Sequence, residues 1–331
     1  MSADRDILYP WLSGPWQRLT GDLERVSHAI LLSGTAGLGK RALAGELAHS
    51  LLCDKPVDGH ACGQCKSCQL FAAGTHPDLT VVQPAEEGKS IPVDDIRELN
   101  RFLSLTAHTA PRKVVLLSPA ETMTLQAANA LLKQLEEPPP GNVLILVSHQ
   151  SDRLPVTIRS RCTRVELSPP SRELGGAWLV EQGVPAEVAP LLLRNAGDAP
   201  LRAQALWSGG FLEQRERLME GLAGLARRGG DPVACGGDWL ESGAHTSLVW
   251  FYGLLRDLLR VRFDRGAEKE LANTDLRSRL AHAAEKMPAA AIAELAGRVQ
   301  EGLRLLGSGV DERLLIEDIL IRWNKSNLTA K

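Results

Sequence analysis

The chain has 331 residues, which is enough for two or three domains. Its 44% hydrophobic and 24% charged residues are typical of a soluble globular protein, and the net charge of −2 excludes a basic field that would hold the whole chain on nucleic acid. The N-terminal segment lacks the apolar stretch of a signal peptide, and no run of about 18 apolar residues occurs, so we expect a cytoplasmic protein that does not cross a membrane.

The first half of the chain alternates short apolar runs with amphipathic segments. Strands are predicted at 29–32, 79–82, 113–117, 142–147 and 163–167, of which 29–32, 113–117 and 142–147 are continuous apolar runs. Apolar residues at helical spacing predict helices at 40–52, 92–105 and 120–135. Strands that are apolar throughout and separated by helices are typical of a parallel sheet covered on both faces. We therefore expect an α/β domain over residues 1–167.

After Pro169 and Pro170 the pattern becomes helical. Helices are predicted at 172–181, 186–193, 201–206, 212–227, 248–263, 275–287, 289–306 and 312–325. Residues 208–210 are interpreted as a linker, and the glycine pairs 229–230 and 236–237 as turns. This predicts a small helical domain over 168–208 and an all-helical domain over 209–331.

The first predicted strand is followed by a glycine-rich loop that opens a predicted helix. Gly34, Gly39 and Lys40 match the phosphate-binding pattern G-x-x-x-x-G-K-[S/T]. In such loops the backbone N–H groups and the helix N-terminus cradle phosphate groups, and the lysine contacts the terminal phosphates. Gly34, Gly39 and Lys40 are therefore candidate nucleotide-binding residues.

Two features that ATP hydrolysis needs are missing from the sequence. The pattern ends in Arg41 instead of the Ser or Thr whose hydroxyl binds Mg²⁺. The strand at 113–117 runs into Ser118 and Pro119, where an ATPase of this layout carries acidic residues; Glu121 is the nearest acid, about a helical turn away. We expect no hydrolysis at this loop. Two interpretations of the loop stay open: it binds nucleotide without turnover, or it is kept only for packing. We favour the second.

Four of the six cysteines lie close together. Cys53, Cys62, Cys65 and Cys68 follow the spacing C-x8-C-x2-C-x2-C. Four thiolates can surround a tetrahedral Zn²⁺ and leave no position for water, so the spacing predicts a structural ion. An iron–sulfur cluster and free thiols are the alternatives. The other two cysteines lie far from this group and are interpreted as packing residues.

A basic segment, Thr-Ile-Arg-Ser-Arg-Cys, occupies residues 157–162 after the last long apolar strand. Arg159, Arg161 and Arg164 lie close together, and the residues alone do not distinguish among them.

The glycine-rich loop, the four-cysteine insertion, Asn129–Pro139 (NALLKQLEEPP) and residues 158–162 (IRSRC) occur in one order. In this order they resemble bacterial clamp-loader subunits of the AAA+ class. The motifs cover residues 30–165, and only the helical character and the length support the rest. The resemblance implies an AAA+ P-loop type α/β domain with a zinc insertion at 53–68, a helical lid domain, and a C-terminal collar domain that holds a ring together. A self-contained helical bundle fits the C-terminal pattern equally well.

Subunits of this family form a ring of gamma/tau and delta-type subunits that loads the sliding clamp onto primed DNA for the DNA polymerase III core. The resemblance implies that Arg161 is an arginine finger that acts in trans on the ATP site of a neighbouring gamma/tau subunit. The family's nucleotide-sensing arginine is absent here, because Pro200 stands at that place and Arg202 follows two residues later. The resemblance thus implies a member of the ring that does not hydrolyse ATP, with gamma/tau and delta subunits as partners.

Two other functions stay open at this point. A self-sufficient gamma-type ATPase would turn over ATP alone. A helicase-loader or recombination-type AAA+ protein would form homo-oligomers and has no need of the four-cysteine insertion.

Overall fold

The computed structural model describes residues 8–86, 88–225, 230–264, 271–306 and 309–328. Contacts divide the chain into two compact units, Met1–Pro170 and Ser171–Lys331. The first unit is an α/β layer structure and the second is entirely helical over its described residues.

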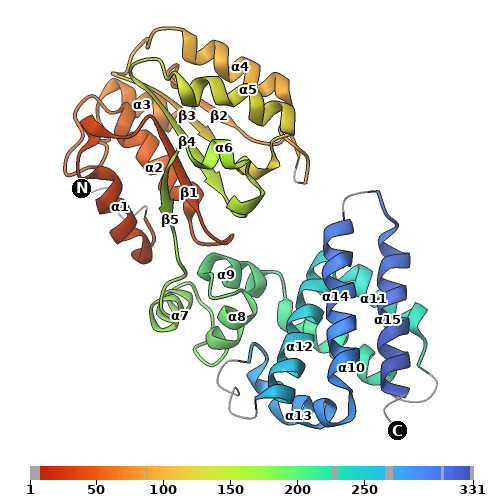
Figure 1. Ribbon diagram of the computed structural model, residues 1–331. Coiled ribbons are helices and arrows are strands. Elements are labelled where there is room, and N and C mark those ends of the chain that lie inside the picture. Colours follow the sequence, from red (N-terminus) through yellow and green to blue (C-terminus); the bar gives the residue numbers. More distant parts are fainter. Residues whose placement is uncertain (1–7, 87, 226–229, 265–270, 307–308, 329–331) are drawn as a thin grey trace. The chain divides into compact units, whose positions relative to one another are not determined.

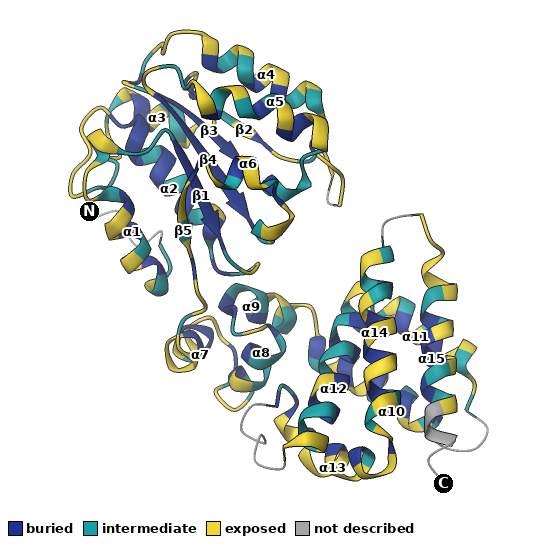
Figure 2. Ribbon diagram, in the orientation of Figure 1, coloured by how far each residue is buried: buried dark blue, intermediate teal, exposed yellow. Residues whose placement is uncertain are grey.

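The first unit is built on a parallel sheet with the strand order β2-β3-β4-β1-β5. Its strands are β1 (Ala29–Ser33), β2 (Leu79–Val82), β3 (Lys113–Leu117), β4 (Asn142–Ser148) and β5 (Thr163–Glu166). Every residue of β1, β3 and β4 is buried, which is why these strands are apolar without alternation (Figure 2). The α/β fold with a parallel sheet that the sequence predicts is confirmed.

Helices cover both faces of this sheet (Figure 1). Helices α4 and α5 pack together on one face, and α2 contacts the sheet from the other. The α-helices of the unit are α1 (Ser13–Thr20), α2 (Lys40–Leu52), α3 (Lys66–Ala72), α4 (Val93–Ser104), α5 (Leu125–Glu136) and α6 (Val156–Arg159). Short 3-10 turns occur at η1 (Pro10–Leu12), η2 (Leu23–Arg25), η3 (Ala120–Thr122) and η4 (Ser151–Arg153). Helix α3, within the four-cysteine insertion, was not predicted.

The predicted helix at 120–135 is wrong at its start. Ala120–Thr122 forms η3, and α5 begins only at Leu125. The intervening segment pairs with Ile91, whose N–H donates to the Thr122 carbonyl and whose carbonyl accepts from Thr124 N–H. The Thr124 hydroxyl then accepts from Ala127 N–H at 3.1 Å, which caps the helix. The cap and the pairing together outweigh the continuous helical pattern.

Over its described residues, the second unit contains three short helices followed by six further helices. The short ones are α7 (Arg172–Glu181), α8 (Ala189–Asn195) and α9 (Pro200–Ser208). The others are α10 (Phe211–Leu225), α11 (Pro232–Glu241), α12 (Ala244–Phe263), α13 (Arg277–Lys286), α14 (Ala289–Leu305) and α15 (Glu312–Leu328), with a 3-10 turn η6 (Thr274–Leu276) before α13. Of the predicted linker at 208–210, Ser208 ends α9, and Gly209 and Gly210 lie between α9 and α10. The division into domains at 167/168 and 208/209 stays a prediction.

One sequence interpretation in this unit is wrong. Gly236 and Gly237 are not a turn, because they lie inside α11. A Cβ at Gly236 would come within 3.2 Å of Glu317 Cγ, so the glycine lets α11 approach α15 closely. Residues 226–229, which include the end of a predicted helix and one predicted turn glycine, lie outside the described residues.

Aromatic side chains form the centre of the second unit. Trp239 and Phe251 meet edge to face with ring centroids 5.2 Å apart, and Phe251 meets Trp323 in the same way at 5.4 Å. The apolar stretch of α12 that contains Phe251 is therefore buried within its own unit.

Candidate functional site

The glycine-rich loop joins β1 to α2 at the carboxyl edge of the sheet. Gly34 and Gly39 have φ values of 140° and 83°, which favour glycine. A Cβ at Gly34 would collide with the Leu167 carbonyl oxygen, and one at Gly39 with the Tyr9 ring. The loop has therefore kept the backbone shape that its glycines permit.

Lys40 is turned into the loop itself. Its side chain is 2% exposed, and its ammonium donates to the carbonyl oxygens of Gly34 and Thr35, each at 2.5 Å. Burial lowers the pKa of Lys40 to about 8, and the charge of Glu121 acts in the opposite direction. The ammonium is thus mostly protonated at neutral pH and is bonded by the loop's own backbone.

Glu121 belongs to this site, which sequence reasoning missed. The turn η3 carries its carboxylate back toward β4, where Oε1 accepts from the backbone N–H of His149 at 2.9 Å. Burial lowers the pKa of His149, Lys40 lowers it further, and Glu121 opposes the change. Lys40, Glu121 and His149 therefore form one electrostatic cluster. The signal available in the sequence was that Glu121 is the first acid after β3.

The positions that would hold Mg²⁺ offer different chemistry. Arg41 donates to Gln83 Oε1 at 2.9 Å and is exposed. Ser118 is buried, and its N–H donates to the Val82 carbonyl. Pro119 has no side-chain oxygen. A hard divalent ion needs oxygen ligands, and a guanidinium at its place repels it.

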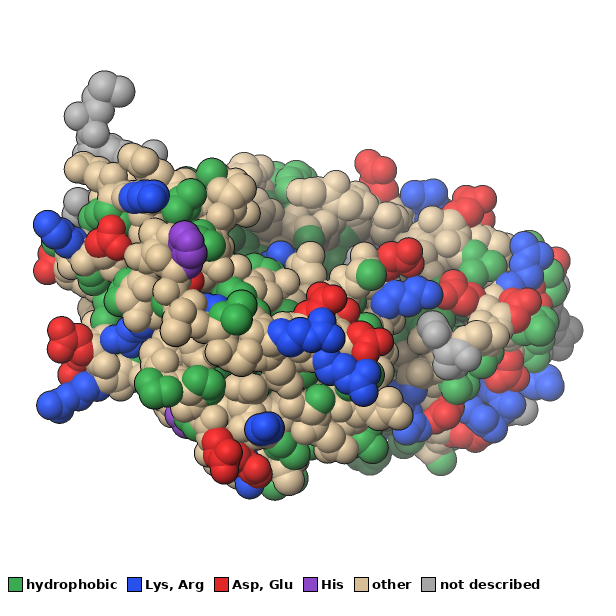
Figure 3. Space-filling view, turned by 90° about the horizontal axis from the view of Figure 1, so that it is seen from above, with side chains coloured by type: hydrophobic (Ala, Val, Ile, Leu, Met, Phe, Trp, Pro, Cys, Tyr) green, Lys and Arg blue, Asp and Glu red, His purple; other side chains and the backbone are tan. Residues whose placement is uncertain are grey.

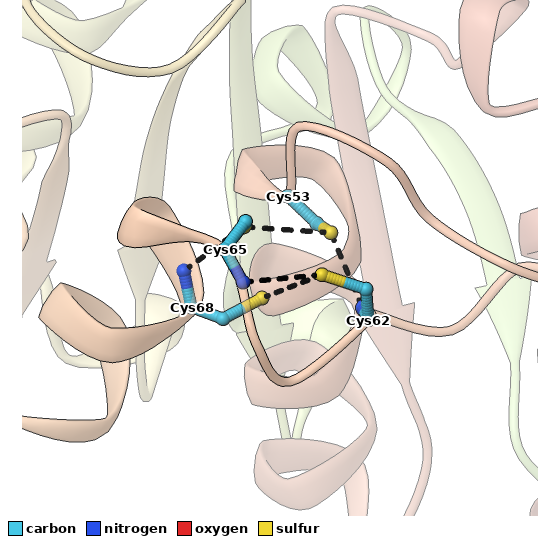
Figure 4. A group of neighbouring side chains, drawn as sticks. All are labelled: Cys53, Cys62, Cys65 and Cys68. Carbon is cyan, nitrogen blue, oxygen red and sulfur yellow. Dashed lines mark hydrogen bonds between the residues drawn. The ribbon is translucent and has the colours of Figure 1, made fainter.

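The four cysteines predicted as metal ligands come together (Figure 4). Their sulfur atoms all lie within 4.8 Å of one another. The Sγ atoms of Cys53 and Cys65 are 4.0 Å apart, and those of Cys62 and Cys68 are 3.9 Å apart. Tetrahedral zinc with Zn–S bonds of about 2.3 Å places sulfurs about 3.8 Å apart. The donor set therefore fits a structural zinc ion.

Backbone N–H groups point at three of these sulfurs. Cys62 N–H donates to Cys53 Sγ at 3.2 Å, Cys65 N–H to Cys62 Sγ and Cys68 N–H to Cys65 Sγ, both at 3.4 Å. Backbone donors from Gln64 and Cys65 lower the pKa of Cys62 to about 6. Burial raises the pKa of Cys53 and Cys68. The N–H···S hydrogen bonds favour the thiolate form of cysteine, which is the form that binds metal.

The cysteine insertion is attached to its surroundings by two histidines. The indole of Trp16, in α1, donates to His60 Nε2 at 3.0 Å. The hydroxyl of Ser67, which lies in α3 directly before Cys68, donates to the Leu52 carbonyl at 2.6 Å and lies 2.6 Å from His76 Nε2. The cluster is thus joined to α1 and to the end of α2.

Arg161 follows the short helix α6 and is half-buried, with 36% of its side chain exposed. Its guanidinium forms an ion pair with Glu136 at 2.7 Å and donates to the Thr157 carbonyl at 3.0 Å. Cys162, next in the chain, is buried against the core formed by α4, α5 and the sheet. Arg161 is therefore an accessible side chain on a firmly packed support.

The neighbouring arginines have different surroundings. Arg164 lies on the edge strand β5 and lines a cavity of about 490 Å³ together with Thr35 and Glu166. Pro200 begins α9 in the second unit. Partial desolvation lowers the pKa of His245, and the charge of Arg202 lowers it further. Cys235 is buried, as its interpretation as a packing residue requires.

Acidic and basic side chains are mixed on the molecular face shown in Figure 3, with no large area of one sign. Among the described residues, no helix combines the length and apolarity that crossing a membrane would take.

Comparisons with known proteins agree with one another. A family model described as "DNA polymerase III, delta subunit" matches residues 16–171, and one described as "DNA polymerase III, delta subunit, C terminal" matches residues 209–325. The "DNA polymerase III subunit delta'" of Pseudomonas aeruginosa is 39% identical over 322 residues, covering 96% of this chain and 97% of the relative. The protein of the same name from Escherichia coli is 33% identical over 320 residues, covering 95% and 94%.

Among solved structures, a "DNA polymerase III, gamma subunit-related protein" of Thermotoga maritima is 20% identical with a TM-score of 0.46, covering 94% of this chain and 99% of that one. The sequence relatives, matched over nearly their full length, are enough to assign the family. The chain belongs to the family of the DNA polymerase III subunit delta'.

Proposed function

We propose that this chain is a clamp-loader subunit that does not hydrolyse ATP and that supplies Arg161 in trans to the ATP site of a neighbouring gamma/tau subunit. The names of its relatives support a place in the DNA polymerase III clamp loader. Its partners in this proposal are gamma/tau and delta subunits, and through them the sliding clamp and primed DNA. The polymerase activity then belongs to the complex and not to this chain.

The observation that carries the proposal is a contrast. Arg161 is accessible and oriented, whereas the phosphate loop of the same chain lacks groups that ATP hydrolysis needs. The guanidinium is accessible and held in one orientation by two contacts. The phosphate loop of the same chain has Arg41 at the metal position, and Ser118 and Pro119 follow β3 where acids are needed. An arginine that stabilises charge on a transferring phosphoryl group can be supplied by a neighbouring protein, and such an arginine raises turnover by about 10³- to 10⁵-fold.

The test is Arg161→Ala in a complex reconstituted with gamma/tau and delta subunits. The complex should assemble normally, and the DNA- and clamp-stimulated ATPase of the site that Arg161 serves should fall by about 10³-fold. Arg164→Ala is the matched control, because it removes a nearby exposed arginine and should leave turnover unchanged. Unchanged ATPase activity in the Arg161→Ala complex would contradict the proposal.

Lys40 raises the separate question of whether this chain itself turns over ATP. We propose that the loop does not turn over ATP, since its lysine is bonded to loop carbonyls and its metal ligands are replaced. The purified chain with Mg²⁺ and ATP should show no turnover above that of its Lys40→Ala variant. Turnover that Lys40→Ala abolishes would instead support a gamma-type ATPase.

We infer that the four cysteines hold one structural Zn²⁺. Their distances and N–H···S bonds support four thiolate ligands, and a closed set leaves no position for a reacting water. Elemental analysis of the purified chain should give about one zinc ion per molecule, and iron at that level would support the alternative cluster. Cys65→Ser should lower the zinc content, whereas Cys162→Ser should keep it, because Cys162 lies outside the group.

A further inference from the structure

The contact that holds Arg161 comes from the end of α5. Glu136, the last residue of that helix, accepts from the Arg161 guanidinium at 2.7 Å through Oε1. The second contact is local, from the guanidinium to the carbonyl of Thr157 four residues earlier. Helices α5 and α6 pack against each other, so the two ends of the ion pair stand on contacting elements.

Glu136 is an unusual residue for its place in α5. An acidic side chain at a helix C-terminus faces the negative end of the helix dipole, which disfavours it. Helix α5 nevertheless ends in Glu136 and is followed directly by Glu137. Helix stability therefore does not explain the carboxylate, whereas the ion pair with Arg161 gives it a favourable partner.

The two contacts leave most of the guanidinium available. Arginine has five N–H donors. One hydrogen of Nη1 goes to Thr157 and one of Nη2 to Glu136, so the Nε hydrogen and the second hydrogens of Nη1 and Nη2 are not used by these two bonds. An anion can then be bound by Arg161 while Glu136 stays in place. The contacts thus orient the guanidinium without consuming it.

We propose that Glu136 is a positioning residue that orients Arg161 for the ATP site of the neighbouring subunit. This inference rests on the proposed function of Arg161. A free arginine side chain must lose much of its rotamer freedom when it contacts a phosphate. An ion pair that already holds the guanidinium removes part of that cost, so it acts on turnover rather than on ATP binding.

The effect should be modest, because both side chains are about half exposed. Exposed ion pairs change an equilibrium by about two- to fivefold. Glu136→Ala in the reconstituted complex should lower the stimulated kcat of the site that Arg161 serves by that factor, with little change in the KM for ATP. Glu136→Gln should restore most of the turnover, because its amide oxygen still accepts from the guanidinium.

Two further variants make the test specific. Glu137→Ala removes the adjacent carboxylate, for which no ion pair is recorded among the described residues, and should leave kcat unchanged. The double variant Glu136→Ala with Arg161→Ala should be no slower than Arg161→Ala alone, because a positioning residue acts only through the group that it positions.

The outcomes separate this inference from the function on which it rests. If Arg161→Ala leaves ATPase unchanged, the proposed finger itself is wrong. If Arg161→Ala is slow but Glu136→Ala has wild-type kcat, the finger stands and Glu136 does not position it. A rise in turnover or a fall in KM for both Glu136 variants would overturn positioning in favour of a carboxylate that competes with the phosphate for Arg161.

Discussion

At the scale of single residues, three histidines of the first unit, one buried and two half-buried, make its stability sensitive to pH. Burial lowers the pKa of His49, His76 and His149. His76 shows why the neutral form is required: Nδ1 accepts from Asp78 N–H at 3.1 Å, so the ring proton sits on Nε2 beside Ser67. A second proton on the ring would remove that acceptor.

The stability of the chain should therefore decrease as the pH falls below about 6.5, the pKa of an unfolded histidine. In that range the unfolded chain binds protons that the folded chain does not, so the free energy of unfolding decreases with falling pH until the lowered pKa values are reached. Urea unfolding at pH 7.5 and 5.5 measures the difference. His76→Gln should reduce this difference in the free energy of unfolding, whereas His108→Gln, at an exposed histidine, should leave it unchanged. The same difference in both variants would contradict a role for His76.

Residue patterns also show how far the site could be predicted. Gly34, Gly39, Lys40 and the four cysteines were found because their chemistry depends on short spacings within one segment. The ion pair of Arg161 with Glu136 and the approach of Glu121 to Lys40 were not found. Both join segments that only the packing of α5, η3 and β4 brings together.

At the scale of elements, all five strands were predicted to within a residue. For β1, β3 and β4 the reason is that burial on both faces makes them apolar without alternation. Helices α3 and α11 were missed for a common reason. Helix α3 is seven residues long and ordered beside the cysteine cluster, and α11 contains two glycines that local propensity assigns to a turn. Tertiary contacts decide both, and they cannot be read from a short window.

Helix packing in the second unit gives a matched pair of glycines. A Cβ at Gly221, in α10, would lie 2.7 Å from Cys235 Sγ, whereas one at Gly237, in α11, would meet nothing within 4 Å. Gly221→Ala should destabilise the chain by about 1–3 kcal/mol through overpacking. Gly237→Ala should stabilise it by about 0.5–1 kcal/mol through helix propensity. Thermal or urea unfolding measures both, and equal effects would refute this account of α10 and α11.

At the scale of the whole molecule, the distribution of charge predicts that the isolated chain binds DNA only weakly. The net charge is −2, and acidic and basic side chains are mixed on the face shown in Figure 3. Affinity for DNA comes mainly from lysine and arginine contacts to phosphates. The isolated chain should bind a primed duplex no more tightly than about 10⁻⁵ M at physiological salt. Fluorescence anisotropy tests this, and binding in the nanomolar range would contradict it.

The contact between Trp16 and His60 has a consequence for how the isolated protein should be handled. Helix α1 meets the cysteine insertion through that bond, and Trp11, just ahead of α1, donates to the Leu38 carbonyl in the glycine-rich loop at 2.9 Å. One short N-terminal segment therefore touches both places. If the four cysteines hold zinc as proposed, loss of the ion should disturb this segment and, through it, the glycine-rich loop. Metal content should therefore be matched before variants of Lys40 are compared.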